Sequence, residues 1–358
     1  MLCLTALGLL AQAALSHAFE PARPGYRYRF PRDHAAHERF RTEWWYYAGH
    51  LTTESGRVFG FQLTFFRSGI DNPPDNPSRW TVRHLYLAHF AISDLKARRH
   101  VYFEKLNRAG VDLAGAATDR YRVWNENWLA EATDGIHRLK ARADGYAVDL
   151  EAKPLKPPVI HGRRGVSRKG PEPGQASHYY SLTRLAVQGI LTVDGKAHRV
   201  TGTAWMDHEF GSGQLSADQV GWDWFGLQLD DGTELMLYRL RRRDGTVEPA
   251  SSGTWITRSG KAVHLARDDA QVDVLAHWSS PASRGRYPMG WRIRVPRLDL
   301  DCRVSPAFPE QELITEKSTG VTYWEGSVSL RCSRRGKQVT GRGYVELVGY
   351  AEAFRRRL

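Results

Sequence analysis

The chain contains an internal repeat, and this repeat constrains the fold more than any other feature of the sequence. Residues 200–207 read VTGTAWMD and residues 339–346 read VTGRGYVE, and each segment follows a glycine, a strand pattern and a turn. An aromatic residue and a carboxylate recur at the same offsets in both segments. Each half of the chain is therefore predicted to close on the same kind of β-hairpin.

A second similarity links the segments that open the two halves. Residues 44–46 read WWY and residues 222–225 read WDWF, and each is followed by a strand pattern, a turn and another strand pattern. Two similarities in the same order indicate a duplicated β-fold, with a boundary near 212–219, where Gly, Ser and Asp gather. Because the last strand of a barrel pairs with its first strand, the repeated end hairpins favour barrels over sandwiches.

Strand patterns dominate the rest of the chain, and Asp-Gly turns separate many of them. Amphipathic helices are scarce, and we expect only short helical turns near 104–107 and 309–313. A chain of 358 residues is long for one hydrophobic core. We therefore predict an all-β protein of two related antiparallel β-barrel domains, 19–215 and 216–358, with a pocket at and between them. The clearest strand segments are 57–66, 189–193, 199–206, 226–229 and 339–347.

The first eighteen residues have the pattern of an export signal. They are apolar from Leu2 to Leu15 and end in Ser16-His17-Ala18, with small residues at the −3 and −1 positions of a cleavage site. We expect cleavage after Ala18 and a periplasmic or secreted protein. Cleavage leaves Cys302 and Cys332, which form either a disulfide or two buried thiols.

The formal charge of +12 comes mostly from scattered arginines. The scattered arrangement of the arginines favours a solvated basic surface. Contact with anionic lipid headgroups is the alternative. No recognised nucleic-acid-binding motif accompanies the charge, so nucleic acid is not an expected partner. The basic stretch 154–178 is rich in Pro and Gly and has no periodicity, which is typical of either a lid or a plain surface loop.

The common catalytic signatures are missing. The sequence contains no G-x-S-x-G elbow, H-E-x-x-H helix, Walker loop, G-x-G-x-x-G turn or C-x-x-C pair. No residue spacing identifies a metal site, and we expect no cofactor.

The densest group of reactive side chains lies at residues 205–211, WMDHEFG. On a strand, alternation directs Trp205, Asp207 and Glu209 to one face and His208 to the other. In a lumen lined by aromatic rings, desolvation and like-charge repulsion would raise a carboxyl pKa and produce a general acid near neutral pH. On an outward face the same carboxylates are simply solvated.

Carboxylates stand beside indoles at three further places, and one histidine joins them as a candidate. Glu43 precedes the first aromatic strand, and we consider it with the cluster at 205–211. Aromatic residues of a strand pack in a core as often as they line a pocket, and a lone histidine more often has a structural role. For these residues, core packing and pocket lining therefore both stay open. The other candidates for pocket lining are Trp44, Trp45, Tyr46, His89, Trp222, Asp223, Trp224, Tyr323, Trp324 and Glu325.

Together these motifs resemble the carotenoid 1,2-hydratase/AttH-like family of lipocalin-like proteins, and they are most similar to its secreted branch. The resemblance covers nearly the whole mature chain and implies two lipocalin-like barrels with a ligand cavity at and between them. The motifs that carry it are FPRDH at 30–34, TEWWY at 42–46, LTFFR at 63–67, MDHE at 206–209, GWDW at 221–224 and YWEG at 323–326.

The resemblance implies two possible functions. One branch of the family resembles hydratases that add water to a terminal alkene of acyclic carotenes. Another consists of secreted proteins associated with ABC exporters and often described as hydrolases. We therefore consider a cofactor-free hydro-lyase, or less favourably a hydrolase, acting on a lipophilic small molecule. The alternative is a carrier that presents an apolar ligand to an ABC transporter permease.

For a hydratase, the resemblance and the chemistry together assign roles to particular residues. Alkene hydration needs an acid, an aromatic wall for the carbocation and a base that activates water. Asp207 or Glu209 would be the acid, and His208 or Glu43 the partner of the water. Tyr238 is the nearest match to a tyrosine that precedes a carboxylate in the family's second half, but here Arg239 follows it. The aromatic wall would consist of Trp45, Trp205 and Trp224.

Overall fold

A computed structural model describes residues 19–71, 78, 80–213 and 215–354 of the chain. The predicted leader, 1–18, lies outside the described residues. The all-β prediction is confirmed, because the described part contains strands and short 3-10 turns but no α-helix. The 3-10 turns are η1 (Arg32–His34), η2 (Arg267–Asp269) and η3 (Pro296–Leu298). Within these ranges, no helix is long and apolar enough to cross a membrane.

The short helical turns expected near 104–107 and 309–313 are wrong. Residues 104–107 belong to strand β4, which pairs with β3 along its whole length. Residues 309–311 form an irregular segment, and residues 312–313 begin β23, which pairs with β24. In both places backbone pairing with a neighbouring strand prevails over the weak local helical preference.

The first half of the chain forms a 13-stranded antiparallel sheet in the order β4-β3-β2-β1-β13-β12-β9-β8-β7-β6-β5. The sheet nearly closes, since the Asn107 amide of β4 donates a hydrogen bond to Asn125 Oδ1 of β6 at 2.7 Å. Two short strands, β10 and β11, pair with β12 off this path. The bounds are β1 (Thr42–Thr53), β2 (Val58–Gly69), β3 (His84–Asp94), β4 (Arg99–Arg108), β5 (Ala114–Ala116), β6 (Arg122–Asn125), β7 (Trp128–Thr133), β8 (Ile136–Ala143), β9 (Tyr146–Pro154), β10 (Val159–Ile160), β11 (Ser167–Arg168), β12 (Ala176–Val193) and β13 (Lys196–Gly211).

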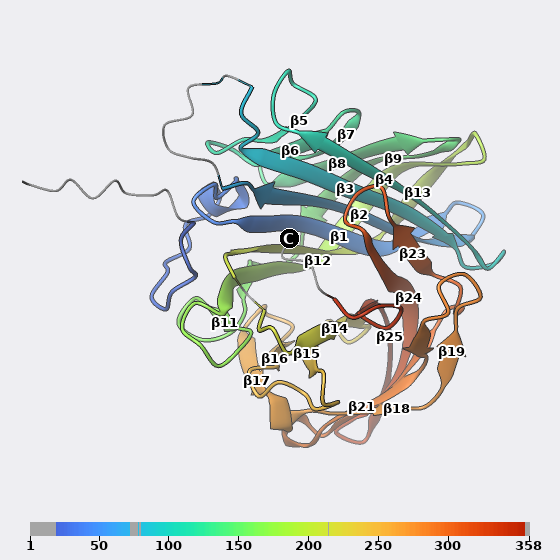
Figure 1. Cartoon of the computed structure of the whole chain (residues 1–358). Helices are drawn as coiled ribbons and strands as arrows, with labels where there is room; N and C mark the ends of the chain where they lie inside the picture. Colours follow the sequence, from blue (N-terminus) through green and yellow to red (C-terminus); the bar gives the residue numbers. More distant parts are fainter. Residues whose placement is uncertain (1–18, 72–77, 79, 214, 355–358) are drawn as a thin grey trace, which may run out of the picture.

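The second half forms a 10-stranded sheet in the order β17-β16-β15-β14-β25-β24-β22-β21-β18, with β23 paired to β24. In Figure 1 the first sheet, blue to green, lies above the second, yellow to red. A separate two-stranded sheet joins β19 to β20. The bounds are β14 (Gln219–Leu229), β15 (Glu234–Arg242), β16 (Ser252–Ile256), β17 (Ala262–Ala266), β18 (Gln271–Val274), β19 (His277–Ser279), β20 (Arg286–Pro288), β21 (Trp291–Val295), β22 (Leu300–Pro306), β23 (Glu312–Thr315), β24 (Val321–Arg334) and β25 (Lys337–Val348).

The last strand of each sheet pairs with its first strand, as the repeat predicted. β13 pairs antiparallel with β1, and β25 pairs antiparallel with β14. The glycine of each VTG segment lies where two strands approach closely. A Cβ on Gly202 would lie 1.8 Å from the carbonyl oxygen of His50, and one on Gly341 would lie 2.4 Å from that of Gln228. The repeated glycine is therefore required by the closing strand pair.

Alternation along the strands builds three buried clusters. Trp45, Tyr47 and Met206 belong to the core of the first barrel, and Phe225 and Trp324 belong to that of the second. A third cluster contains residues of opposite parity from both halves, so it lies where the outer faces of the barrels meet. Its members include Tyr46, Tyr179, Trp205, Trp224, Tyr238 and Tyr344.

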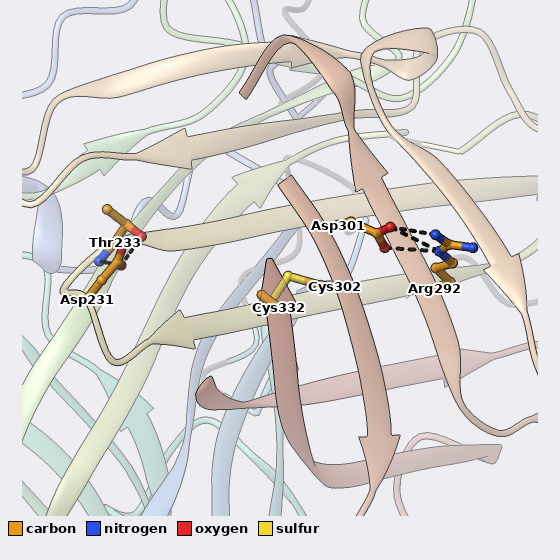
Figure 2. The surroundings of a disulfide bond; sticks show 6 residues. All are labelled: Asp231, Thr233, Arg292, Asp301, Cys302 and Cys332. Atoms are coloured by element: carbon orange, nitrogen blue, oxygen red, sulfur yellow. Dashed lines mark hydrogen bonds and ion pairs between the residues drawn. A yellow bond between two sulfur atoms is a disulfide. The ribbon is translucent and has the colours of Figure 1, made fainter. Parts of the chain in front are cut away.

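A disulfide joins Cys302 of β22 to Cys332 of β24 inside the second barrel (Figure 2). The two residues face each other in the strand register, and their Cα atoms are 4.0 Å apart. Of the two states that the sequence leaves open, the structure therefore contains the bridged one. Arg292 and Asp301 form an exposed ion pair on the neighbouring strands at 2.6 Å.

The basic stretch after β9 is an ordered strap rather than a loose loop. We use "strap" for residues 155–175, which include β10 and β11. His161 and Lys169 of the strap are buried. Lys156 Nζ is 2.6 Å from Glu234 Oε2 in β15, so the strap is tied to the second barrel. In this way the strap covers one side of the junction between the barrels.

Candidate functional site

The most reactive group of side chains lies between the two barrels. We call it the seam cluster and define it as Tyr46, Tyr179, Trp205, Asp207, Trp224, Glu325 and Glu346. Hydrogen bonds cross from one barrel to the other here: Tyr46 donates to Glu325 Oε1 at 2.8 Å, and Trp224 Nε1 donates to the Tyr179 hydroxyl at 2.9 Å. The cluster is therefore assembled from both halves of the duplication.

Asp207 is the carboxyl that the first barrel contributes. Its Oδ1 accepts from Trp205 Nε1 at 2.6 Å and from the Ser181 hydroxyl, and its Oδ2 accepts from the Tyr179 hydroxyl at 2.7 Å. Burial nevertheless raises its pKa to about 7, because these neutral donors only partly replace water. Asp207 therefore exchanges a proton near neutral pH.

The second barrel contributes two carboxyl groups that face each other. Glu325 of β24 and Glu346 of β25 are directly opposite in the register. Burial, and then repulsion from Glu346, raises the pKa of Glu325 well above its usual range. Burial raises the pKa of Glu346 to about 7, and this carboxyl accepts from Trp222 Nε1 at 2.7 Å.

Glu325 differs from its neighbours in having an unused oxygen. Its Oε1 accepts from Tyr46, whereas its buried Oε2 has no hydrogen-bond partner among the described residues. Because burial and the facing Glu346 favour the protonated form of Glu325 and raise its pKa, the unused oxygen is placed to donate a proton to a bound molecule.

Glu209 shares the face of Asp207 but is already paired. Its Oε1 is 3.0 Å from Lys169 Nζ of the strap and also accepts from the Ser177 hydroxyl. Lys169 lies over the ring of Tyr238, 4.0 Å from its centre. Burial lowers the pKa of Lys169, but attraction to Glu209 outweighs this effect and the pKa is raised. Glu209 and Tyr238 thus hold the strap.

Two buried histidines extend hydrogen-bond chains from the junction between the barrels. His161 Nε2 is 2.6 Å from the Ser181 hydroxyl, which in turn bonds Asp207. His89 Nδ1 is 2.7 Å from the Tyr323 hydroxyl, and its Nε2 is 2.9 Å from the Ser318 hydroxyl. Burial lowers the pKa of both histidines to about 3, so both rings are neutral at pH 7.

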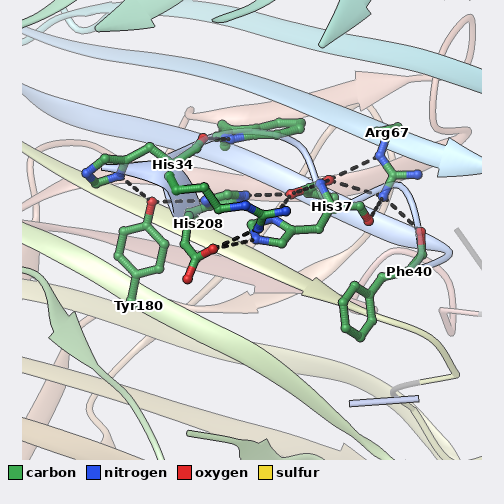
Figure 3. A network of polar contacts seen from close by, with 10 residues as sticks. His34, His37, Phe40, Arg67, Tyr180 and His208 are labelled. Carbon is green, nitrogen blue, oxygen red and sulfur yellow. Dashed lines mark hydrogen bonds and ion pairs between the residues drawn. The ribbon is translucent and has the colours of Figure 1, made fainter. Parts of the chain in front are cut away.

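Glu43 and His208 lie on the opposite face of the sheet, at the end of the first barrel. The two are hydrogen-bonded to each other at 2.8 Å, and His37 Nδ1 is also 2.8 Å from Glu43 Oε1 (Figure 3). Arg67, which is fully buried, donates to Glu43 Oε2 at 3.1 Å. We call Glu43, His37, His208 and Arg67 the inner cluster.

Electrostatics in the inner cluster favour an ionised carboxylate. Burial alone would raise the pKa of Glu43, but Arg67, His208 and His37 outweigh it and hold the pKa far below the usual range. Ligand atoms of His37, Glu43 and His208 lie within 4.8 Å of one another, a spacing at which a metal ion could be held. However, Glu43 already accepts hydrogen bonds from all three neighbours and from the His37 amide, so a metal would have to displace them.

The structure therefore divides the predicted site residues. The hypothesis that His208 or Glu43 acts beside Asp207 is not supported by the geometry, because the sheet separates them. The same parity places Trp45 inside the first barrel, stacked on His208 at 4.9 Å. The second barrel supplies two of the three seam carboxyls, Glu325 and Glu346.

In the second barrel, alternation likewise separates neighbours in sequence. Trp324 lies in the interior, where its Nε1 donates to the Pro309 carbonyl. Asp223 is ion-paired with Arg241 at 3.1 Å and lies away from the seam cluster. The remaining predicted residues, Trp44 and Trp222, are partly buried, and their strand parity is that of Tyr46 and Trp224. Whether any of these residues acts in catalysis stays a prediction.

Sequence reasoning missed several polar residues of the junction. Glu325 was among the predicted pocket residues, but its partner Glu346 was not, although the repeat matches Glu346 with Asp207. No local pattern marks the others, which come from β12 and the strap. They are Tyr179, Ser181, His161 and Lys169.

Solved structures share this architecture. The structure of a protein assigned to AttH from Nitrosomonas europaea superimposes with a TM-score of 0.84 at 35% sequence identity, covering 92% of this chain and 99% of that one. Kievitone hydratase from Nectria haematococca superimposes with a TM-score of 0.70 at 17% identity, covering 94% and 95%. CghA, solved with Sch210972, gives a TM-score of 0.53 at 13% identity, covering 86% and 89%.

The sequence comparisons agree with the structural ones. No curated protein sequence matches the chain significantly. The family model described as AttH-like matches residues 21–350, which include both barrels. The two more distant structures support the fold alone. On the family match and the 35% identical structure, the chain is a member of the AttH-like family.

Proposed function

We propose that the protein adds water to an alkene of a lipophilic, isoprenoid-like substrate at the seam cluster. The observation that carries this proposal is Glu325, a buried carboxyl whose Oε2 has no partner among the described residues and whose pKa is raised by burial. Its place among aromatic rings supports carbocation chemistry. Two structural neighbours of the same fold, one of them named as a hydratase, are consistent with it.

In the proposed reaction, Glu325 transfers its proton to one alkene carbon, and the positive charge develops on the more substituted carbon. The faces of Trp205, Trp224 and Tyr46 stabilise that charge. A water molecule attacks the cation and loses a proton to Asp207, whose pKa of about 7 suits a base at neutral pH. Proton return from Asp207 to Glu325 restores the enzyme, so no cofactor or redox step is needed.

Access to the site depends on the strap in this proposal. Tyr46, Trp205 and Asp207 are almost completely buried, so a substrate enters only when the junction opens. The strap covers the site and is held by the Lys169–Glu209 pair. We therefore assign it the role of a lid.

The test is incubation of the purified protein with a series of acyclic isoprenoid alkenes, followed by mass spectrometry of the extracted lipid. The expected result is a product heavier by one water. Glu325→Gln and Asp207→Asn should each lower the rate by about a hundredfold or more, as for loss of a general acid or base. The control is Glu312→Gln, which removes a carboxylate that also accepts from hydroxyl groups but lies outside the seam cluster.

A negative outcome also has a definite meaning. If the wild type binds such lipids without altering them, and both seam variants bind equally well, hydration is excluded and the carrier function replaces it. In that case delivery to an ABC transporter permease becomes the proposal to examine. Export remains part of either proposal, and N-terminal sequencing of the protein from its own cells tests cleavage after Ala18.

A further inference from the structure

A large pocket lies beneath the segment that precedes β1, away from the seam cluster. Its volume is about 1310 Å³, and residues 20–40 form most of its wall, with Thr118 and His178 on the barrel side. Five arginines line it, against three carboxylates. The arginines are Arg23, Arg27, Arg29, Arg32 and Arg39.

The local sequence explains why arginines gather here. Residues 26–30 read YRYRF and lie outside the named strands, and their burial alternates, with the aromatic residues partly buried and both arginines exposed. Tyr26 and Tyr28 pack against the barrel, with Tyr26 4.3 Å from the ring of His178 and Tyr28 5.9 Å from that of Tyr180. Arg27 and Arg29 are both exposed, and both line the same pocket as Tyr26.

Charge pairing divides the five arginines into two groups. Arg39 is paired with Glu20, and Arg32 is 2.8 Å from Asp33. The side chains of Arg23, Arg27 and Arg29 have no ion pair or hydrogen bond with any other described residue.

The carboxylates of the pocket do not compensate this charge. Asp33 is already occupied, because it accepts from Arg32, from the Arg29 amide at 2.6 Å and from His37. Glu38 is exposed and lies 3.5 Å from His84. Three guanidinium groups thus line one pocket wall without a counter-charge.

Apolar side chains line the same pocket. They belong to Tyr26, Phe40, Ala36, Pro21 and Pro24. A ligand that satisfies both kinds of lining has an anionic group for the arginines and an apolar portion for these side chains. Guanidinium groups bind phosphate through paired N–H donors, and a phosphate offers enough oxygen atoms for more than one arginine.

We propose that this pocket is a binding site for a phosphate-bearing amphiphile. Arg23, Arg27 and Arg29 hold the phosphate group, and Tyr26 and Phe40 contact the apolar part. The site is independent of the seam cluster and of the hydration proposed there. Its phosphate comes either from a membrane lipid headgroup or from a soluble phosphate ester.

The experiment measures binding by calorimetry with two soluble probes, glycerol 3-phosphate and a short-chain phosphatidylglycerol below its micellar concentration. Sedimentation with phosphatidylcholine vesicles, with and without phosphatidylglycerol, distinguishes a membrane source from a soluble one. The test variant is Arg27→Gln with Arg29→Gln. The matched control is Arg292→Gln with Arg294→Gln, because these arginines also stand two residues apart on a surface strand but are paired with Asp301 and Asp273.

The expected result is that the test variant binds the short-chain lipid about tenfold or more weakly, as for the loss of charged hydrogen bonds. The control should stay within about twofold of the wild type, since net charge alone contributes little to a specific site. Equal losses in both variants would show non-specific attraction and overturn the site. Failure of the wild type to bind any probe would overturn the site as well. Equal affinity for glycerol 3-phosphate and the lipid would overturn the proposal that Tyr26 and Phe40 contact the apolar part of the ligand.

Both variants change exposed side chains, so their folding is expected to match the wild type, which thermal unfolding checks. The hydration assay is run on the same samples. If phosphate binding fails while hydration persists, only the pocket proposal is wrong. If hydration fails while phosphate binding persists, only the proposed function is wrong.

Discussion

The carboxyl of the inner cluster and those of the seam cluster lie on opposite faces of the sheet formed by β1 and β13, and their pKa values shift in opposite directions. In the inner cluster, Glu43 contacts a buried arginine and two histidines, and its pKa falls far below the usual range. In the seam cluster, Asp207 and Glu325 accept hydrogen bonds only from neutral groups, and their pKa values rise. Both carboxyl groups are equally remote from water, so burial alone does not decide the charge.

The difference shows what decides the ionisation of a buried acid. A positive partner favours the carboxylate through direct attraction, whereas hydroxyl and indole donors only partly offset desolvation. The inner cluster is therefore suited to stabilising the fold, and the seam cluster is suited to exchanging protons. The following changes test this contrast, from the largest expected effect to the smallest.

Arg67→Met should be the most damaging change. It removes the positive partner of Glu43 and leaves a buried carboxylate, which costs about 3–5 kcal/mol of unfolding free energy. Urea unfolding at neutral pH measures it. As a control, Arg292→Met breaks a pair whose side chains are 51% and 40% exposed, and it should cost far less than Arg67→Met because solvent screens this pair. Similar losses in both variants would contradict the structural role of the inner cluster.

Asp207→Asn should change how stability depends on pH. Burial raises the pKa of Asp207 from 3.8 to about 7, so its contribution is fully present below pH 3.8 and is lost as pH rises through 7. The variant has no carboxyl at this position and therefore lacks this loss. The unfolding free energy of the variant minus that of the wild type should rise by up to about 4 kcal/mol as the pH increases from below 3.8 to 8.

The difference between the two proteins is the correct measurement, because buried histidines act in the opposite direction. The pKa of His50 is lowered by burial, so protonation opposes folding below pH 6.5 and stability rises toward that pH. This contribution is common to the wild type and Asp207→Asn and cancels in their difference. A difference that does not vary with pH would show that folding does not raise the pKa of Asp207.

Glu325→Gln should have the smallest effect on stability. A glutamine amide resembles a protonated carboxyl in size and polarity, so the unfolding free energy at pH 7 should change by less than about 1 kcal/mol. A loss as large as that of Arg67→Met would mean that Glu325 is ionised in the folded protein. The two clusters would then share one charge state, and the proposed proton donor would be wrong.

Much of the fold could be predicted from local pattern. The repeated VTG segments predicted that β13 closes on β1 and β25 on β14, because the same hairpin needs the same close strand approach in both halves. The helical turn expected near 104–107 failed because pairing with β3 outweighs the local preference of four residues.

The candidate site was predictable only in part. Alternation separated Asp207 from His208, since strand side chains alternate with a period of two. It also made Trp45 and Tyr46 face opposite ways, although both were considered for one pocket. No periodicity indicates that Lys169 of the strap reaches Glu209, because the contact joins segments that are distant in the chain and have no shared register.

The sequence by itself determined the duplication, the strand pattern and the sets of residues that share a face. Only the tertiary structure decided what covers each face. A period of two distinguishes one side of a strand from the other, but a second barrel must dock before the outer side of β13 becomes a buried site. That docking brings Glu325 to Tyr46 and removes both from water, and the desolvation keeps the carboxyl protonated.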